Sequence, residues 1–159
     1  MIRIVRLVCA AALVALAAQS PAFADAAQDA ALAPVHSFID GLNKGDMKSA
    51  AAAYVRAPSI IDEFTPYHWH GTKAFAQWGS DFGKWAKAVG ATEPHIDLEP
   101  ALRVAVTGKH AYAVVPARFS FKQDGAARRE RGIFTFALTK MAKGWRIASW
   151  SWAWASDYK

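Results

Sequence analysis

One carboxylate stands out as a candidate for chemistry, because Asp62 sits in an apolar run that predicts a strand, Ser59-Ile60-Ile61-Asp62-Glu63-Phe64. An acid on the inner face of a strand is costly to bury, so it must be paired, be protonated or act on a ligand. Ile60 and Phe64 share its face and are expected to exclude water, which would raise its pKa. Glu63 is expected to point the other way and reach solvent. The structural alternative is a carboxylate held by loop amides.

The groups that could assist Asp62 follow in the segment Thr65-Pro66-Tyr67-His68-Trp69-His70-Gly71, where a cavity mouth would lie. Tyr67 and His68 are candidate proton donors, and together with Asp62 they make the expected catalytic set. His68 and His70 would share a face only in an extended segment, and no further ligand pair of known spacing follows. We therefore expect loop histidines and no metal.

The first 24 residues predict a secretory signal peptide. Two arginines precede an apolar stretch over residues 7–18, and Ala22 and Ala24 supply the small residues of a cleavage site. The mature chain would then begin at Asp25, in the periplasm or outside the cell. The apolar stretch is shorter than the roughly 20 residues that span a bilayer, so no stable membrane anchor is expected.

The remaining 135 residues (159 minus 24) suit a single domain over residues 25–159. The one cysteine, Cys9, lies in the expected signal peptide, which excludes disulfides and thiol chemistry from the mature chain. Without its two signal-peptide arginines the chain keeps 17 basic and 13 acidic residues. Much of the excess lies in residues 122–131 around Asp124-Gly125. A solvated hairpin tip explains it, so no nucleic-acid partner is expected.

Three helices are expected before the main sheet. Pro34 would open the first, and Asn43-Lys44-Gly45 would close it. Asp46 would cap the second, which would include Tyr54 and end before Pro58. The apolar face of the first helix holds Leu32, Val35, Phe38, Ile39 and Leu42.

The third helix follows Thr72, which is expected to be its cap. Its large side chains recur at helical spacing and form one aromatic stripe. The stripe is formed by Phe75, Trp78, Phe82, Trp85 and Val89. Such spacing is what packing onto a sheet demands, so we expect core residues rather than a cofactor site.

From Pro94 onward the apolar period changes to two. Four strands are expected, over residues 95–106, 111–121, 131–141 and 145–155. Long neighbouring strands with short turns make an antiparallel meander, and the preceding helices make the domain α+β. A strongly curved sheet wrapped around the helices would leave a pocket.

The last expected strand carries Trp150, Trp152 and Trp154 on one face. Facing inward they would stack on a flat ligand, and facing outward they would form a patch that a dimer partner covers. We favour the outward orientation, because small residues on the other face would let helices approach the sheet. The neighbouring strand already supplies an apolar lining with Gly132, Phe134, Phe136 and Leu138.

This order of elements resembles the SnoaL-like and ketosteroid-isomerase-like members of the nuclear transport factor 2 superfamily, over roughly residues 34–155. The matching features include Asn43-Lys44-Gly45-Asp46, the strand that contains Asp62, the turn Trp69-His70-Gly71 and the four-strand meander. The resemblance implies a cone-shaped α+β barrel. In it, a curved antiparallel sheet wraps around three N-terminal helices and encloses an apolar pocket, often in a homodimer.

The resemblance also implies that Asp62 occupies the position of the ketosteroid isomerase general base. The tyrosine that donates to the substrate oxyanion falls on Phe38, and the protonated aspartate beside it falls on Gly132. Those two donors provide a large part of the rate in such sites. Steroid isomerisation by that route is therefore not expected, although Asp62 could abstract a proton or activate water with other helpers.

Three functions stay open. The first is an exported domain that binds a small apolar or aromatic molecule, with Asp62 contacting a polar group. The second is a proton-transfer enzyme (isomerase, cyclase, hydratase or lyase) with Asp62 as general base and Tyr67, His68 or Trp69 as donor. The third is a homodimeric interaction module with a vestigial pocket. The expected ligand-binding residues are Phe38, Tyr54, Phe64, Trp69, Phe134 and Phe136. No nucleotide, flavin or haem signature is present, so no cofactor is expected.

Overall fold

The computed structural model describes residues 21–155, with side chains from residue 25 onward. The expected signal peptide therefore lies outside the described residues up to residue 20. Within the described range, we find no helix with both the length and the hydropathy that crossing a bilayer would require.

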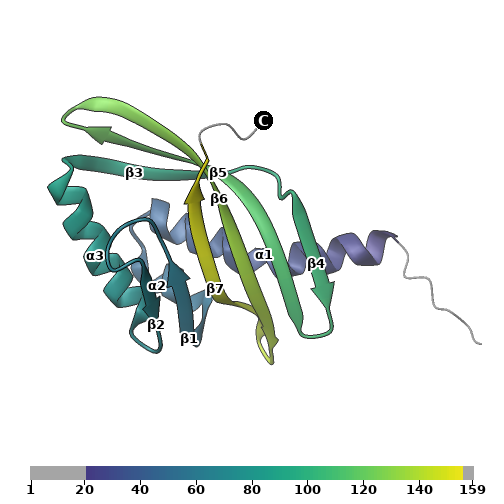
Figure 1. Ribbon diagram of the computed structural model, residues 1–159. Helices are drawn as coiled ribbons and strands as arrows, with labels where there is room; N and C mark the ends of the chain where they lie inside the picture. The colour runs from purple at the N-terminus through teal and green to yellow at the C-terminus, as the bar shows by residue number, and fades with distance from the viewer. Residues whose placement is uncertain (1–20, 156–159) are drawn as a thin grey trace, which may run out of the picture.

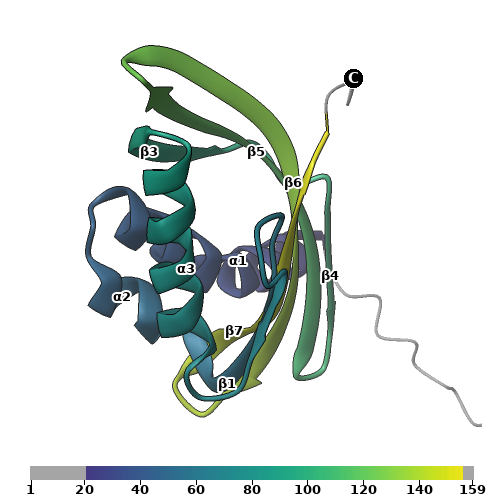
Figure 2. The ribbon, with the colours of Figure 1, turned by 60° about the vertical axis from the view of Figure 1, so that its left-hand side comes forward.

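A curved sheet with helices on its concave side makes up the described chain (Figures 1 and 2). The helices are α1 (Pro21–Asn43), α2 (Met47–Ala52) and α3 (Ala74–Ala88). The strands are β1 (Tyr54–Ile61), β2 (His68–His70), β3 (Ala91–Leu98), β4 (Arg103–Thr107), β5 (His110–Gln123), β6 (Ala126–Met141) and β7 (Gly144–Trp154). The α+β class predicted from the sequence is confirmed.

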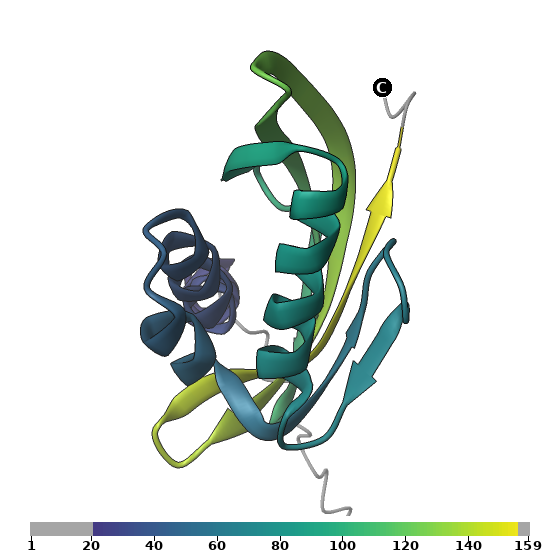
Figure 3. The same cartoon turned by 90° about the vertical axis from the view of Figure 1, so that its left-hand side faces the viewer.

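The sheet runs in the order β2-β1-β7-β6-β5-β3, and β4 pairs with β5 beside β3. Its neighbours are antiparallel except β1 and β7, which run parallel. The sheet is open rather than closed into a barrel, and α3 stands across its concave face in the side view (Figure 3). The space between α1, α2, α3 and the sheet is where a pocket can form.

The first helix is longer than predicted. Pro34 lies inside α1 instead of opening it, and the helix continues through it. Buried side chains on both sides of the proline, among them Ala31 and Phe38, hold the helix against the sheet and offset the lost N–H bond. The predicted end at Asn43 is confirmed. The Asn43 side chain exchanges two 2.8 Å hydrogen bonds with the backbone of Ile96, which ties the end of α1 to β3.

The second helix is shorter than predicted. Asp46 caps it as expected, because its Oδ1 accepts a 3.0 Å hydrogen bond from the Ser49 amide. However, Tyr54 begins β1 rather than ending α2, and Pro58 lies inside that strand. The pairing of β1 with β7 shifts register between Tyr54 and Ser59, and this irregularity accommodates a residue that cannot donate to a ladder.

Two further boundaries differ from the prediction. The N-cap of α3 is Lys73, with no side-chain cap bond, so the expected cap at Thr72 is wrong. The single strand predicted over residues 95–106 is two strands, β3 and β4, interrupted around Pro100. Both pair with β5, which is long enough to hold β3 along one half and β4 along the other.

The tryptophans of β7 do not face outward as predicted. Phe134 pairs with Trp152 and Phe136 pairs with Trp150, so these residues share the concave face of the sheet. Trp150 is buried, and Trp154 at the strand end is exposed. The predicted outward orientation relied on the small residues of the other face. The curved sheet, however, leaves enough depth on its concave side for indole rings.

Candidate functional site

A cavity of about 550 Å³ lies between the helices and the concave face of the sheet. That volume suits a small organic molecule. Half of its lining residues are aromatic: Phe38, Phe64, Trp78, Phe82, Trp85, Phe119, Phe134, Trp150 and Trp152. The aromatic stripe predicted for α3 therefore serves as core and also as cavity wall.

Asp62 lies at this cavity, one residue beyond the end of β1 rather than within the strand as predicted. Its Oδ2 accepts a 2.8 Å hydrogen bond from Trp78 Nε1, and its Oδ1 accepts a 2.8 Å bond from the backbone amide of Glu63. Its own amide donates to the carbonyl of Tyr67 over 3.1 Å, which closes the loop behind it. The carboxylate is thus held from two elements, the start of the loop and the N-terminal half of α3.

Burial raises the pKa of Asp62 from 3.8 to about 6. The Trp78 and Glu63 hydrogen bonds stabilise the ionised form and lower the pKa, whereas the charge of Glu63 raises it. Burial has the largest effect on this pKa, as the flanking apolar residues predicted. At neutral pH the group is largely ionised, yet close enough to its pKa to exchange a proton readily.

Two more carboxylates reach the same cavity, and the sequence analysis missed both. Glu63 is exposed to solvent, as predicted, but it does not point away from Asp62. The chain turns after β1, so the Glu63 side chain also lines the cavity, and its Oε1 accepts a 2.6 Å hydrogen bond from the Trp154 amide. Glu130 lies on β6, and burial, followed by the charge of Glu63, raises its pKa. The alternation of β6 could have indicated it, since Glu130 shares the face of Gly132 and Phe134.

Tyr67 and His68 do not contact this cavity, so the predicted catalytic set is not assembled. Tyr67 is 57% exposed. The pairing of β2 with β1 explains the orientation of His68, because it lies opposite the exposed Ile61, whereas Trp69 lies opposite the buried Ile60. Alternate residues of a strand face opposite sides, so His68 points outward.

His68 contacts two other polar side chains on the outer side of the sheet. His68 Nε2 lies 2.9 Å from Ser59 Oγ, and its ring stacks on His70 with centroids 5.1 Å apart. A shallow depression of about 410 Å³ includes both histidines and Asp81. Across residues 21–155, however, no group of three His, Cys, Asp or Glu side chains is arranged to hold a metal ion.

The expected ligand-binding residues divide into two sets. Phe38, Phe64 and Phe134 line the cavity directly. Tyr54, Trp69 and Phe136 are buried behind that wall. Two of these are held by hydrogen bonds, since the Tyr54 hydroxyl accepts a 2.6 Å bond from Trp150 Nε1 and Trp69 Nε1 donates to Asp81 over 3.0 Å. The second set therefore packs behind the cavity wall and does not line the cavity.

No protein-family model and no curated protein sequence matches this chain. Solved structures do resemble it. A nuclear transport factor 2-like superfamily protein from Salmonella enterica serovar Typhimurium aligns with a TM-score of 0.68 at 16% identity, over 86% of this chain and 96% of that one. A ketosteroid isomerase-like protein from Erwinia carotovora atroseptica gives 0.64 at 16% identity, over 82% and 97%. A protein from Novosphingobium aromaticivorans with a cystatin-like fold gives 0.68 at 15% identity, over 86% and 88%.

Proposed function

We propose that this chain, which has the nuclear transport factor 2-like fold, is a binding protein for a small apolar or aromatic molecule that places a polar group against Asp62. The observation that carries the proposal is a carboxylate set in an aromatic cavity wall. Each Asp62 oxygen accepts one hydrogen bond from the protein. A carboxylate oxygen has a further lone pair, so each can accept a second bond from a ligand.

The aromatic wall supports a flat or apolar body for the ligand. Trp152 packs on Phe134 with centroids 4.7 Å apart, and Trp78 stacks on Phe82 at 5.6 Å. Rings fixed in this way offer large apolar faces at little cost in side-chain entropy. The one hydrogen-bond donor of the ligand would then fix the ligand's orientation by bonding to Asp62.

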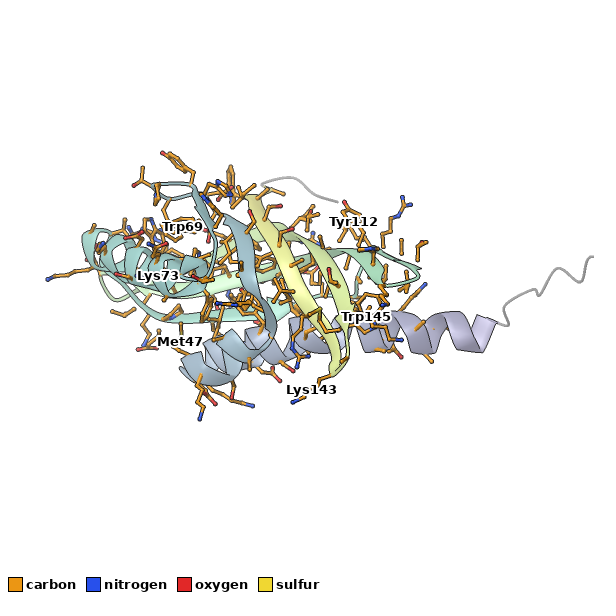
Figure 4. All side chains as sticks on the ribbon, turned by 90° about the horizontal axis from the view of Figure 1, so that it is seen from below. Met47, Trp69, Lys73, Tyr112, Lys143 and Trp145 are labelled. Carbon is orange, nitrogen blue, oxygen red and sulfur yellow. The ribbon has the colours of Figure 1, made fainter. Side chains whose placement is uncertain are left out.

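Calorimetric titration with 2-naphthol tests this function. The probe has a flat apolar body and one O–H donor. Phe134→Ala is expected to weaken its binding about three- to tenfold, because a stacking face is lost. Tyr112→Ala is the control, since Tyr112 is exposed, does not line the cavity and lies well apart from Met47, a cavity residue (Figure 4). Equal losses from both variants, or no binding to the unmodified protein, would contradict the proposal.

A proton-transfer enzyme is a second candidate, favoured by the pKa of Asp62 at about 6. The helper groups of the ketosteroid isomerases have no counterpart at the matching positions. Phe38 carries no hydroxyl, and any Cβ at Gly132 would collide with the Trp152 ring. An enzyme of this kind would therefore need a hydrogen-bond donor at another position. Deuterium exchange at carbon acids such as 2-indanone, compared by NMR between the natural chain and Asp62→Asn, tests this candidate.

We also propose that the chain is exported. The support is the sequence of residues 1–24, with its two arginines, apolar stretch and Ala-x-Ala site. Cleavage after Ala24 would leave α1 starting at Asp25, and a carboxylate in the first turn of a helix is stabilised by the helix dipole.

A further inference from the structure

The charges that line the cavity are all of one sign. Asp62, Glu63 and Glu130 reach it, whereas none of the lining side chains is Lys, Arg or His. The whole chain has 19 basic and 13 acidic residues, so the composition alone would favour the opposite sign. Acidic residues are thus concentrated at the cavity of a basic protein.

The cavity carboxylates have no ion-pair partner. Some acidic side chains elsewhere do form ion pairs, as in Asp81 with Lys84 at 2.7 Å and Glu93 with Lys122 at 2.7 Å. None of the ion pairs found in residues 21–155 includes a carboxylate of the cavity. Asp62 and Glu130 are partly buried, whereas Glu63 is exposed. A partly buried carboxylate without a counter-charge is unfavourable, and a ligand that carries a positive charge would supply that counter-charge.

Aromatic rings line the same cavity as these acids. Trp78, whose indole nitrogen bonds to Asp62, stacks on Phe82 and meets Trp150 edge to face at 5.4 Å. Phe64, which follows the two loop carboxylates in sequence, stacks on Trp85 at 6.1 Å. The face of an aromatic ring attracts a cation within about 6 Å of its centroid, and tryptophan attracts it most strongly.

We propose that the ligand of this cavity is a hydrophobic organic cation, a protonated amine or a quaternary ammonium group on an apolar or aromatic body. The inference rests on the proposed binding function and specifies its ligand class. The carboxylates neutralise the charge, and the indole and phenyl faces hold both the charge and the apolar body. A carboxylate or phosphate ligand would instead meet three acids and no cation.

Three probes of one shape separate this inference from the proposed function. They are 1-naphthylmethylamine, which is cationic at pH 7.5, the neutral 1-naphthylmethanol and the anionic 1-naphthylacetate. Each is titrated calorimetrically into the mature chain. The amine is expected to bind at least about tenfold more tightly than the alcohol, since a charge-assisted bond to a carboxylate adds to the cation–π attraction. The acetate is expected to bind most weakly.

The outcomes lead to different conclusions. If the alcohol binds as tightly as the amine, or the acetate binds more tightly, the cation inference is wrong and the binding function stands. If none of the three binds, both are wrong. Asp62→Asn combined with Glu130→Gln is expected to reduce the preference for the amine to within about threefold. Asp40→Asn removes the same kind of charge from an exposed site on α1 and should preserve the preference. Because the three probes are also compared on the unmodified chain, a double variant that fails to fold does not prevent the test.

Discussion

The indole nitrogen of Trp78 donates a 2.8 Å hydrogen bond to Asp62 Oδ2, and this bond joins the N-terminal half of α3 to the loop that follows β1. It opposes the effect of burial, because it stabilises the ionised carboxylate that burial destabilises. The two effects together hold the pKa of Asp62 at about 6. The same contact therefore fixes the position of the carboxylate and sets how readily it changes charge.

Trp78→Phe tests this relationship. The variant keeps an aromatic ring but removes the donor, so the pKa of Asp62 is expected to rise above its value of about 6. Carboxyl-carbon NMR over a pH series measures it, with Asp62→Asn identifying the resonance. Trp85→Phe is a matched control on the same helix, because Trp85 also lines the cavity but does not bond to Asp62. An unchanged or lower pKa in Trp78→Phe would show that the bond does not stabilise the charge.

Asp62→Asn is expected to change how stability depends on pH. The acid titrates near 3.8 when the chain is unfolded and near 6 when it is folded, so the folded state binds more protons between these values. Asp62 therefore stabilises the fold at low pH, and this stabilisation is lost as pH rises through about 6. Asparagine stays neutral. Relative to the natural chain, Asp62→Asn should gain stability from pH 4 to pH 7, by up to about 3 kcal/mol.

Urea unfolding at several pH values measures this difference. The comparison between the two chains is necessary because other acids change the pH dependence of stability in the opposite direction. Partner groups lower the pKa of Asp46, Asp81 and Glu99, so each of them favours the fold at higher pH. These groups are the same in both chains and cancel in the difference. A difference that does not vary with pH would mean that Asp62 is not perturbed.

Much of this site could be predicted from the sequence. A period-2 pattern of apolar residues predicts a strand, and a carboxylate among apolar residues predicts a buried acid. Asp62 was found in this way, together with three residues of the cavity wall, Phe38, Phe64 and Phe134. The order of helices and strands was predictable for the same reason. The structure confirms the fold that this order implied.

The side that a residue faces could not be predicted where it depends on pairing between distant strands. His68 points outward because of its register with β1, and Trp152 points inward because of its register with β6. Neither register is visible in the local sequence, since shifting a strand by one residue moves every side chain to the other face. Glu63 lines the cavity together with its neighbour Asp62 for a related reason, because the loop after β1 breaks the strand alternation.

Gly132→Ala is expected to disturb the cavity wall at Trp152. A Cβ at this position would collide with the ring of Trp152 and would lie 2.7 Å from the carbonyl oxygen of Ala153. The backbone of β7 can move little, so the indole must shift. We expect a loss of about 1–3 kcal/mol in unfolding free energy and weaker binding of 2-naphthol. Gly79→Ala is the control at the cavity, since its Cβ would meet only the flexible end of Met47, at 3.4 Å. Equal stability of the two variants would contradict this expectation.

Export can be tested by the mass of the mature chain. Expressed with its full sequence in a Gram-negative host, the protein is expected in the periplasmic fraction with Asp25 as its first residue. Replacing both Ala22 and Ala24 with arginine should prevent cleavage and leave the longer chain associated with the membrane. Recovery of the unmodified chain in the cytoplasm at its full length would contradict the proposal.

Cation binding should strengthen as pH rises through about 6. The titratable groups at the cavity are Asp62, Glu63 and Glu130, with the Tyr54 hydroxyl buried behind them. Burial raises the pKa of that hydroxyl well above its usual range, so it stays neutral. Benzyltrimethylammonium keeps its charge at every pH, which leaves the protein as the source of any pH dependence.

Protonation of Asp62 removes the charge that the cation needs, and burial raises the pKa of Glu130 in the same direction. If the cation binds only the ionised form of Asp62, its affinity should increase about tenfold between pH 5 and pH 7. Calorimetry in buffers of different ionisation enthalpy would show the matching proton release. Asp62→Asn should flatten the profile and leave only the smaller contribution of Glu130, whereas Asp40→Asn should preserve it. An affinity that falls with rising pH would mean that the cavity prefers its carboxylates protonated, as a neutral hydrogen-bonding ligand requires.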